Sequence, residues 1–460
     1  MSLAEYRGLQ AVDGPLVFVD GVRGVGYDEA VEIVGPDGRP RRGRVVLIEE
    51  DRAVVQVFAG TAALVPDGSR VRFLGRHLEM ALSPSILGRT FDGLGEPRDG
   101  CGAVLGGFQS DINGRPINPM ARAYPRDFIH TGLSVIDTLM TLIRGQKLPI
   151  FSSNGLPHNR LAVQIASQSR ITSGDNFAVV FVGIGIRNDD AAYFIEALRD
   201  AGKGQPPVVF LNLASDPVIE RLAAPRTALT AAEYLAFDLG YHVLVVMTDM
   251  TNYCEALREL AVARGEVPSR KGYPGYLYSD LASLYERAGV LRDRPGSLTQ
   301  LPILTMPNDD ITHPIPDLTG FITEGQIVLS REQDAQGAYP PVDIPASLSR
   351  LMKDSIGKGY TRDDHPDLAG QLFASYSRVQ EIRALAGVVG EDELGATEKS
   401  YLRFGDAFER RFLSQGDQED REIGVSLDLA WELLAILPRT ELNRLPSELV
   451  RKHLPSKATK

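Results

Sequence analysis

Cysteine is nearly absent from this 460-residue chain, which has only Cys101 and Cys254. The two lie far apart and match neither a disulfide framework nor a C-x-x-C metal or redox motif, so we expect two reduced thiols without a chemical role. Histidine is also scarce, with seven residues in the whole chain. None of them forms an H-x-x-x-H pair, so the sequence predicts no zinc site.

Long apolar runs and an excess of basic residues are missing as well. No stretch approaches the roughly 20 apolar residues that a membrane helix needs, and the N-terminus lacks the basic and then apolar order of a signal peptide. Lys and Arg number 49 against 60 Asp and Glu, a net charge of -11. That balance opposes binding to nucleic acid or to an anionic lipid surface. We therefore expect a soluble, cytoplasmic protein with no nucleic-acid partner.

The remaining composition is that of an ordinary globular protein, with 43% hydrophobic and 24% charged residues, and its length predicts about two to four domains. Residues 1–75 carry Gly, Pro or Asp every ten residues or so. The segments between, at 30–34, 44–48 and 52–58, are short and valine-rich, with a turn at 35–38. This pattern predicts an N-terminal β-barrel.

Residues 76–350 alternate short valine- and isoleucine-rich runs with helical patterns, which indicates a parallel sheet with crossover helices. We predict strands at 177–183, 208–213 and 242–247, and helices at 189–201 and 230–239. The pattern is typical of an α/β domain of the nucleotide-binding type.

Residues 351–460 show no strand pattern. Apolar residues recur there at helical spacing, which predicts a C-terminal α-helical bundle. The clearest series are Leu368, Leu372, Tyr376 and Val379, and Tyr401, Phe404, Phe408 and Phe412.

The stretch GQKLPIFSSNGLPHNR at 145–160 has the strand, loop and helix order of a phosphate-binding P-loop, with a helix predicted at 161–169. Aligning Gly155 with the last glycine of GxxxxGKS/T places Leu156 where the lysine belongs and Pro157 at the Mg²⁺ hydroxyl. Leucine cannot pair with phosphate charge, and proline has neither a metal-binding oxygen nor an N–H. The loop is degenerate, and we expect no tightly bound Mg-nucleotide.

Two further positions extend this reading. The strand at 243–247 ends in Thr248 and Asp249, as the strand with the second-motif aspartate of P-loop proteins does. Ile186 stands near the place of the carboxylate that polarises the attacking water in hydrolytic relatives. Asp189 and Asp190 read more simply as part of a helix N-terminus. These positions oppose the hypothesis that the chain is a self-sufficient NTPase. The net negative charge opposes another hypothesis, that the chain is a ring-shaped nucleic-acid motor.

Several long motifs resemble those of the B subunit, or beta chain, of V-type and archaeal-type rotary ATPases and ATP synthases. The resemblance spans essentially all three zones, including their order of barrel, nucleotide-type domain and helical end, and its most specific stretches lie between residues 131 and 351. They are TGLSVID at 131–137, RGQKLPIF at 144–151, GLPHN at 155–159, PSRKGYPGYLYSDL at 268–281, MPNDDITHPIPDLTG at 306–320, ITEGQI at 322–327 and PASLSRL at 345–351.

The resemblance implies that the central domain is a RecA-like α/β domain of the P-loop type, and that the chain is a non-catalytic, regulatory subunit. Three such chains would alternate with three catalytic A subunits in a hexamer, together with central shaft and peripheral stalk subunits. Mg-ATP or Mg-ADP would bind at the interface with the A subunits and not tightly to this chain. The complex would lie at the membrane periphery and couple ATP synthesis or hydrolysis to transport through a membrane sector, with H⁺ and Na⁺ both open as the ion.

The resemblance also implies site residues. Arg350, in the match at 345–351, would be an arginine finger that reaches the catalytic site of a neighbouring A subunit, and Arg362 is the rival candidate. Ser153, Asn154 and Gly155 would form a degenerate nucleotide site. Tyr339 is placed like residues that close over an adenine, although a tyrosine beside prolines is equally a packing residue.

Overall fold

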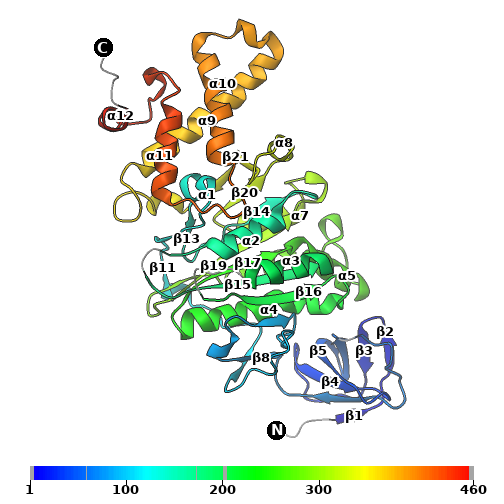
Figure 1. Ribbon diagram of the computed structural model, residues 1–460. Coiled ribbons are helices and arrows are strands. Elements are labelled where there is room, and N and C mark those ends of the chain that lie inside the picture. The colour runs from blue at the N-terminus through cyan, green and yellow to red at the C-terminus, as the bar shows by residue number, and fades with distance from the viewer. Residues whose placement is uncertain (1–4, 59, 172–173, 200–204, 455–460) are drawn as a thin grey trace.

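The computed structural model describes residues 5–58, 60–171, 174–199 and 205–454. They form three parts stacked along the length of the molecule (Figure 1). A β-domain lies at the N-terminal end, an α/β domain in the middle and a group of helices at the far end. The predicted fold class is therefore confirmed.

The N-terminal part is one antiparallel sheet in the order β1, β7, β4, β5, β6, β3, β2. The two edge strands, β1 and β2, are consecutive in the sequence and separated only by residues 8–10, so the sheet must curl until its edges come close. Val17, Ile33 and Val55 lie fully buried inside it. The strands are β1 (Glu5–Arg7), β2 (Ala11–Asp13), β3 (Leu16–Val19), β4 (Ala30–Val34), β5 (Pro40–Glu49), β6 (Arg52–Val57) and β7 (Arg70–Phe73).

The central sheet has the path β21, β20, β14, β19, β17, β15, β16, β9. Every neighbouring pair on this path is parallel except β20 and β21, which are antiparallel. The three predicted strands are confirmed as β15, β16 and β17. The bounds are β9 (Thr90–Asp92), β14 (Ile150–Ser152), β15 (Phe177–Ile186), β16 (Val208–Leu213), β17 (His242–Thr248), β19 (Ser297–Thr305), β20 (Gly325–Leu329) and β21 (Val342–Ser349).

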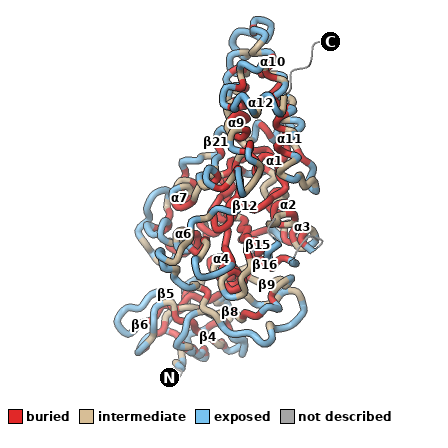
Figure 2. The backbone as a smooth tube through the Cα atoms, turned by 90° about the vertical axis from the view of Figure 1, so that its left-hand side faces the viewer, coloured by how far each residue is buried: buried red, intermediate tan, exposed pale blue. Residues whose placement is uncertain are grey.

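Alternate side chains of the central strands serve two different cores, so the strands are buried on both faces. Figure 2 shows these strands in the colour of buried residues. In β15, Val179 and Phe181 pack with α2 and α3, whereas Val180 and Val182 pack with α4 and α5. This two-sided burial explains why these strands read as continuous apolar runs. The helices are α2 (His158–Gln168), α3 (Asn188–Arg199), α4 (Val218–Glu233), α5 (Met250–Ala263), α6 (Leu277–Tyr285), α7 (Pro314–Ile322) and α8 (Arg331–Ala335).

Two predicted helices differ from the structure at their ends. The helix predicted at 230–239 begins earlier, as α4 at Val218, and runs through Pro225 before a π-helical turn, η3 (Tyr234–Asp238). Burial of Ala223, Ala224 and Ala228 against the sheet outweighs the break that a proline signals. The helix predicted at 189–201 is α3, and residues 200–201 lie outside the described residues.

The C-terminal part is helical, and from residue 351 to residue 454 the structure contains no strand. Its helices continue the core on the α2 side of the sheet, with every member of the two predicted apolar series buried. The bounds are α9 (His365–Val389), α10 (Ala396–Phe408), a π-helical turn η8 (Glu409–Leu413), α11 (Ile423–Leu434) and α12 (Ser447–His453). α1 (Ser134–Leu139) of the central domain packs between α9 and α11.

Short elements complete the chain. They are β8 (Glu79–Leu82) paired with β10 (Phe108–Asp111), β11 (Arg122–Ala123) paired with β18 (Gly289–Leu291), and β12 (Phe128–Ile129) paired with β13 (Leu142–Ile143). Among the described residues, no helix has the length and apolar character that crossing a membrane requires.

Candidate functional site

The degenerate loop lies between β14 and α2, at the carboxyl end of the parallel strands. Ser153 is buried, whereas Asn154 and Gly155 are exposed at the tip. Gly155 has a φ of +87°, a left-handed conformation that favours glycine. The predicted layout of strand, loop and helix is therefore present, although α2 begins three residues earlier than expected.

Leu156 points into the protein and not toward the loop. It is 5% exposed and belongs to the core formed by the sheet, α2 and the C-terminal helices. Pro157 precedes the first turn of α2 and makes no side-chain cap. The position that carries the phosphate-binding lysine in intact loops thus contributes packing in this chain.

The Ser153 side chain lies beside the Asp309 carboxylate. Hydrogen bonds from Arg331, and then from Ser153, hold the pKa of Asp309 below its usual value. The Arg331 guanidinium lies 2.5 Å from the Asp309 carboxylate. The carboxylate beside Ser153 is thus itself held by an arginine of the same chain.

Tyr339 lies beside α2, and a side chain of that helix covers its ring. The Arg160 guanidinium sits 3.7 Å from the centroid of the Tyr339 ring and also pairs with Asp417 of the C-terminal part. Burial raises the pKa of Tyr339, partly offset by Arg160. The Tyr339 ring is 7% exposed, and its hydroxyl has no hydrogen-bond partner among the described residues. One face of this ring is thus covered by the chain's own arginine, a contact that no sequence motif signals.

The carboxylates expected near the loop have structural partners. Asp249 caps α5 by accepting from the Thr251 N–H at 2.8 Å, and it also accepts from the Thr305 N–H at 3.1 Å. Ile186 is buried, as a core residue of β15. Asp189 and Asp190 lie in the first turn of α3, where their charge suits the helix N-terminus.

Arg350 lies at the opposite end of the sheet from the loop. β21 pairs with β20 so that Val342 faces Leu329 at the carboxyl end and Ser349 faces Gly325 at the amino end. Eight residues of strand span about 25 Å, so Arg350 and Tyr339 are separated by roughly that distance. The structure therefore does not bring Arg350 together with Ser153, Asn154, Gly155 and Tyr339.

The Arg350 side chain is exposed. Its Nη1 donates to the Thr323 carbonyl at 3.3 Å, and its backbone N–H donates to the Glu324 carbonyl at 2.9 Å. Within the part of the chain that the structure describes, the bond to the Thr323 carbonyl is the hydrogen bond of the guanidinium, and no acidic side chain pairs with it. Most N–H groups of this guanidinium are therefore available to a group outside the chain.

Arg362 is held inside the C-terminal part. Its guanidinium contacts the Asp364 carboxylate at 2.6 and 2.9 Å and also pairs with Asp428. Asp364 is buried and accepts a further hydrogen bond from Trp431 Nε1 at 2.7 Å. Despite burial, the bonds from Arg362 and Trp431 lower the pKa of Asp364. Arg362 is thus committed to an internal ion pair, unlike Arg350.

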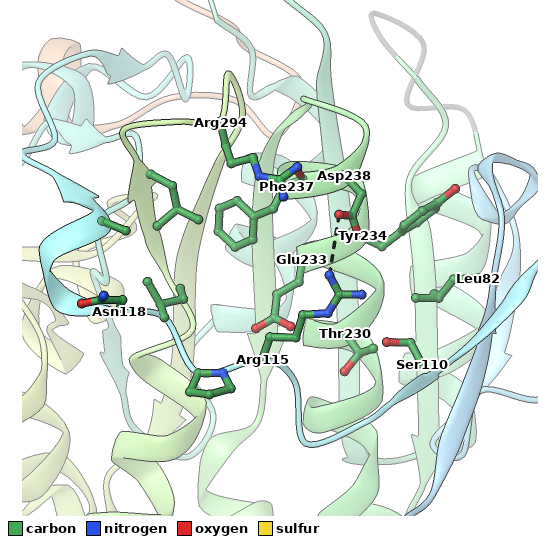
Figure 3. A pocket seen from close by; sticks show the side chains of 14 residues that line it. Leu82, Ser110, Arg115, Asn118, Thr230, Glu233, Tyr234, Phe237, Asp238 and Arg294 are labelled. Atoms are coloured by element: carbon green, nitrogen blue, oxygen red, sulfur yellow. Dashed lines mark hydrogen bonds and ion pairs between the residues drawn. The ribbon is translucent and has the colours of Figure 1, made fainter.

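A separate cavity of about 200 Å³ lies at the amino ends of the strands, on the α4 side of the sheet (Figure 3). Phe237 and Leu291 form apolar walls, and Arg115 reaches toward Asp238 at 3.9 Å. The cavity is far from the degenerate loop, which is at the carboxyl ends of the strands. It therefore adds nothing to that site.

The two thiols differ in setting: Cys101 is exposed and Cys254 is buried. Burial raises the pKa of the Cys254 thiol well above its ordinary value, which keeps it protonated and unreactive. Among the described residues, no group of three or more His, Cys, Asp or Glu side chains is arranged to hold a metal ion.

Three family matches cover most of the chain. Residues 9–75 match the ATP synthase alpha/beta family, beta-barrel domain, and residues 132–349 match the nucleotide-binding domain of that family. Residues 354–454 match the C-terminal domain of V and A type ATP synthase. Residues 132–349, which include the degenerate loop, therefore belong to the nucleotide-binding domain class of that family.

Individual relatives agree over nearly the whole length. The chain is 62% identical to a V-type ATP synthase beta chain of Thermotoga neapolitana, over 98% of each chain. It is 55% identical to the B subunit of an A-type ATP synthase of Aeropyrum pernix, over 99% of this chain and 98% of that one. A solved ATP synthase subunit, NeqB of Nanoarcheaum equitans, is 37% identical with a TM-score of 0.73, over 92% of this chain and 98% of that one.

Proposed function

Because the chain belongs to the family of V-type ATP synthase beta chains and A-type B subunits, we propose that it is the non-catalytic partner at a shared ATP site. It contributes Arg350 to the active site of a catalytic subunit in an alternating hexamer. The observation that carries the proposal is the exposed Arg350 guanidinium, which has no acidic partner among the described residues while its backbone is held.

The chemistry of arginine suits this role. A guanidinium stays charged at all working pH values and presents a planar fork to oxygens that gain charge during phosphoryl transfer. Arg362, the second candidate, is supported less well because Asp364 and Asp428 already neutralise it. Arg350 is therefore the residue that we assign to the shared site.

The degenerate loop has no catalytic part in this proposal. Leu156 packs in the core, Asp309 engages Ser153, and Arg160 covers the Tyr339 ring. These contacts support weak or absent nucleotide binding at Ser153, Asn154, Gly155 and Tyr339. Mg-ATP and Mg-ADP would bind at the interface, mostly through residues of the catalytic subunit, and Mg²⁺ would neutralise the phosphate charge there.

The wider assembly follows from the family. An ATP synthase subunit works within a multi-subunit complex, and we propose contacts with a central shaft, with peripheral stalk subunits and indirectly with a membrane sector that carries H⁺ or Na⁺. The chain would then lie in a cytoplasmic head at the membrane periphery. Whether the complex mainly makes or consumes ATP depends on its other subunits.

The test is ATP hydrolysis by rings reconstituted from this chain, carrying Arg350→Ala, together with the catalytic subunit. We expect the rate to fall by about 10³ to 10⁵, the range for an arginine finger. Rings with Arg362→Ala serve as the matched comparison, and we expect them to stay within about tenfold of the unaltered rate. A fall under tenfold for Arg350→Ala, in rings shown to assemble, would remove Arg350 from the chemistry and promote Arg362.

A further inference from the structure

Lys147 is a buried lysine that the function described so far does not use. The residue is 6% exposed, and its Nζ lies 2.7 Å from a Glu286 oxygen and 3.0 Å from a Glu324 oxygen. An ammonium buried this deeply persists because it is paired on both sides. The pair with Glu324 joins the segment before β14 to the segment before β20.

Glu324 receives a second bond from the same residue. The backbone N–H of Lys147 donates to Glu324 Oε2 at 2.8 Å, and the backbone N–H of Glu324 donates to the Lys147 carbonyl at 3.0 Å. Gln146, fully buried, adds a bond from Nε2 to the Glu324 carbonyl at 3.2 Å and one to Ser349 Oγ at 2.9 Å. The backbone of Glu324 is thus fixed from several directions.

Arg350 rests directly on this fixed segment. Both hydrogen bonds of Arg350 described above end on it, one at the Thr323 carbonyl and one at the Glu324 carbonyl. The next residue, Gly325, has a φ of +136°, and a Cβ there would lie 2.2 Å from the Leu348 carbonyl oxygen. β20 and β21 are therefore closely packed at the point that immediately precedes Arg350 in the chain.

We propose that Lys147 is a positioning residue for Arg350, acting through Glu324. The inference rests on the proposed function, because it gives Lys147 a task only if Arg350 reaches a neighbouring active site. Lys147 itself touches no substrate. It binds the Glu324 carboxylate, and the Glu324 carbonyl accepts the hydrogen bond from the Arg350 backbone N–H. A displacement of about 1 Å in a group that contacts the transition state can cost 10²-fold in rate.

The experiment compares four reconstituted rings: unaltered, Lys147→Met, Arg350→Ala and the double variant, each assayed for single-turnover ATP hydrolysis. Methionine keeps much of the length of the lysine side chain and removes its charge. We expect Lys147→Met to lower the rate about 10- to 100-fold, with KM for ATP changed by less than about threefold. In the Arg350→Ala background, the same substitution should change the rate by less than about twofold, because the arginine to be positioned is gone.

The matched control is Lys271→Met, which removes another lysine from an ion pair, that with Asp310 at 2.9 Å. Neither residue bonds to the Thr323–Glu324 backbone, and we expect the rate to stay within about twofold. If Lys147→Met rings do not assemble, Glu324→Gln replaces it. That change keeps an oxygen that accepts from the Lys147 backbone N–H and removes the ion pair. We expect it to lower the rate roughly three- to tenfold in the unaltered background and to have little effect in the Arg350→Ala background.

Two results would overturn the inference. One is a change of less than about threefold for both substitutions in the unaltered background. The other is an equal loss in both backgrounds, which would mean that Lys147 supports the fold and not the arginine. A small effect of Arg350→Ala alone is a different result, since it contradicts the proposed function itself.

Discussion

The two ends of strand β21 illustrate opposite uses of the same sheet. At the Tyr339 end, Leu156 is buried in the core and Arg160 covers one face of the Tyr339 ring, while Asn154 and Gly155 are exposed at the tip of the loop. At the Arg350 end, the guanidinium is exposed and has no acidic partner among the described residues, while its backbone is tightly held. Under the proposed function, the Tyr339 end, here called the closed end, serves packing, and the Arg350 end, the open end, serves a partner subunit.

The energetics of the two ends differ accordingly. An exposed arginine without an ion pair costs little stability, since surface pairs contribute only about 0–1 kcal/mol. At the closed end, the side chains contribute to stability through buried contacts, and the loss of any one of these contacts lowers the free energy of unfolding. Substitutions at the closed end should therefore change folding, whereas substitutions at the open end should change the activity of the assembled ring.

Leu156→Lys restores the residue type of an intact phosphate loop and is expected to have the largest effect on stability. Leu156 is 5% exposed, so the change forces an ammonium into the core and removes apolar packing. We expect a loss of about 4 kcal/mol in the free energy of unfolding. Urea unfolding of the isolated chain would measure it. Tight ATP binding with unchanged stability would show that the loop is open after all.

Arg362→Ala is expected to have the second-largest effect on stability. It leaves the Asp364 carboxylate, 3% exposed in its side chain, without its main cationic partner. We expect a loss of about 3 kcal/mol in the free energy of unfolding, the low end for a broken buried pair because Arg362 is partly exposed. Arg350→Ala is the matched control, with an expected change below about 0.5 kcal/mol. Equal losses would contradict the distinction between the two arginines.

His365 gives a pH-dependent prediction for the support of the Arg350 end. Its Nε2–H donates to the Thr138 carbonyl of α1 at 2.9 Å, and Ser349 donates to the Thr141 carbonyl just beyond α1. Burial lowers the pKa of His365 to about 4. The unfolded chain binds a proton near pH 6.5 and the folded chain does not, so stability falls as the pH drops from about 6.5 toward 4.

Between pH 7 and pH 5 this difference corresponds to about 2 kcal/mol. Urea unfolding at the two pH values, compared with His365→Gln, would measure it. Because burial also lowers the pKa values of His242 and His313, the His365 contribution is the part of the slope that disappears in the variant. An unchanged slope would show that folding does not lower the pKa of His365.

The architecture was largely predictable because the sequence patterns are strong. Runs such as 208–213 are buried on both faces, and the series from Leu368 to Val379 repeats at helical spacing. The start of α4 was not predictable, since Pro225 signals a break that only tertiary packing overrides. Local patterns report local preference, and long-range burial can reverse it.

The site was predictable in part. The alignment at Gly155 identifies Leu156 and Pro157 as departures, and the motif at 345–351 points to Arg350, whose role stays a prediction. The contacts of Arg160 with Tyr339 and Asp417 join segments far apart in the chain and carry no motif. The same holds for Lys147 with Glu324. Interactions between distant segments depend on how the elements pack, which single-sequence patterns do not encode.

The central claim is that the shared chemistry uses the Arg350 end and not the loop end. The most direct measurement compares ATP hydrolysis by rings carrying Arg350→Ala with rings carrying Asn154→Asp. Asn154 is exposed at the tip of the loop, so an added carboxylate would repel any phosphate there with little effect on packing. We predict a fall of about 10³ or more for Arg350→Ala and less than about threefold for Asn154→Asp. The reverse order would contradict the account.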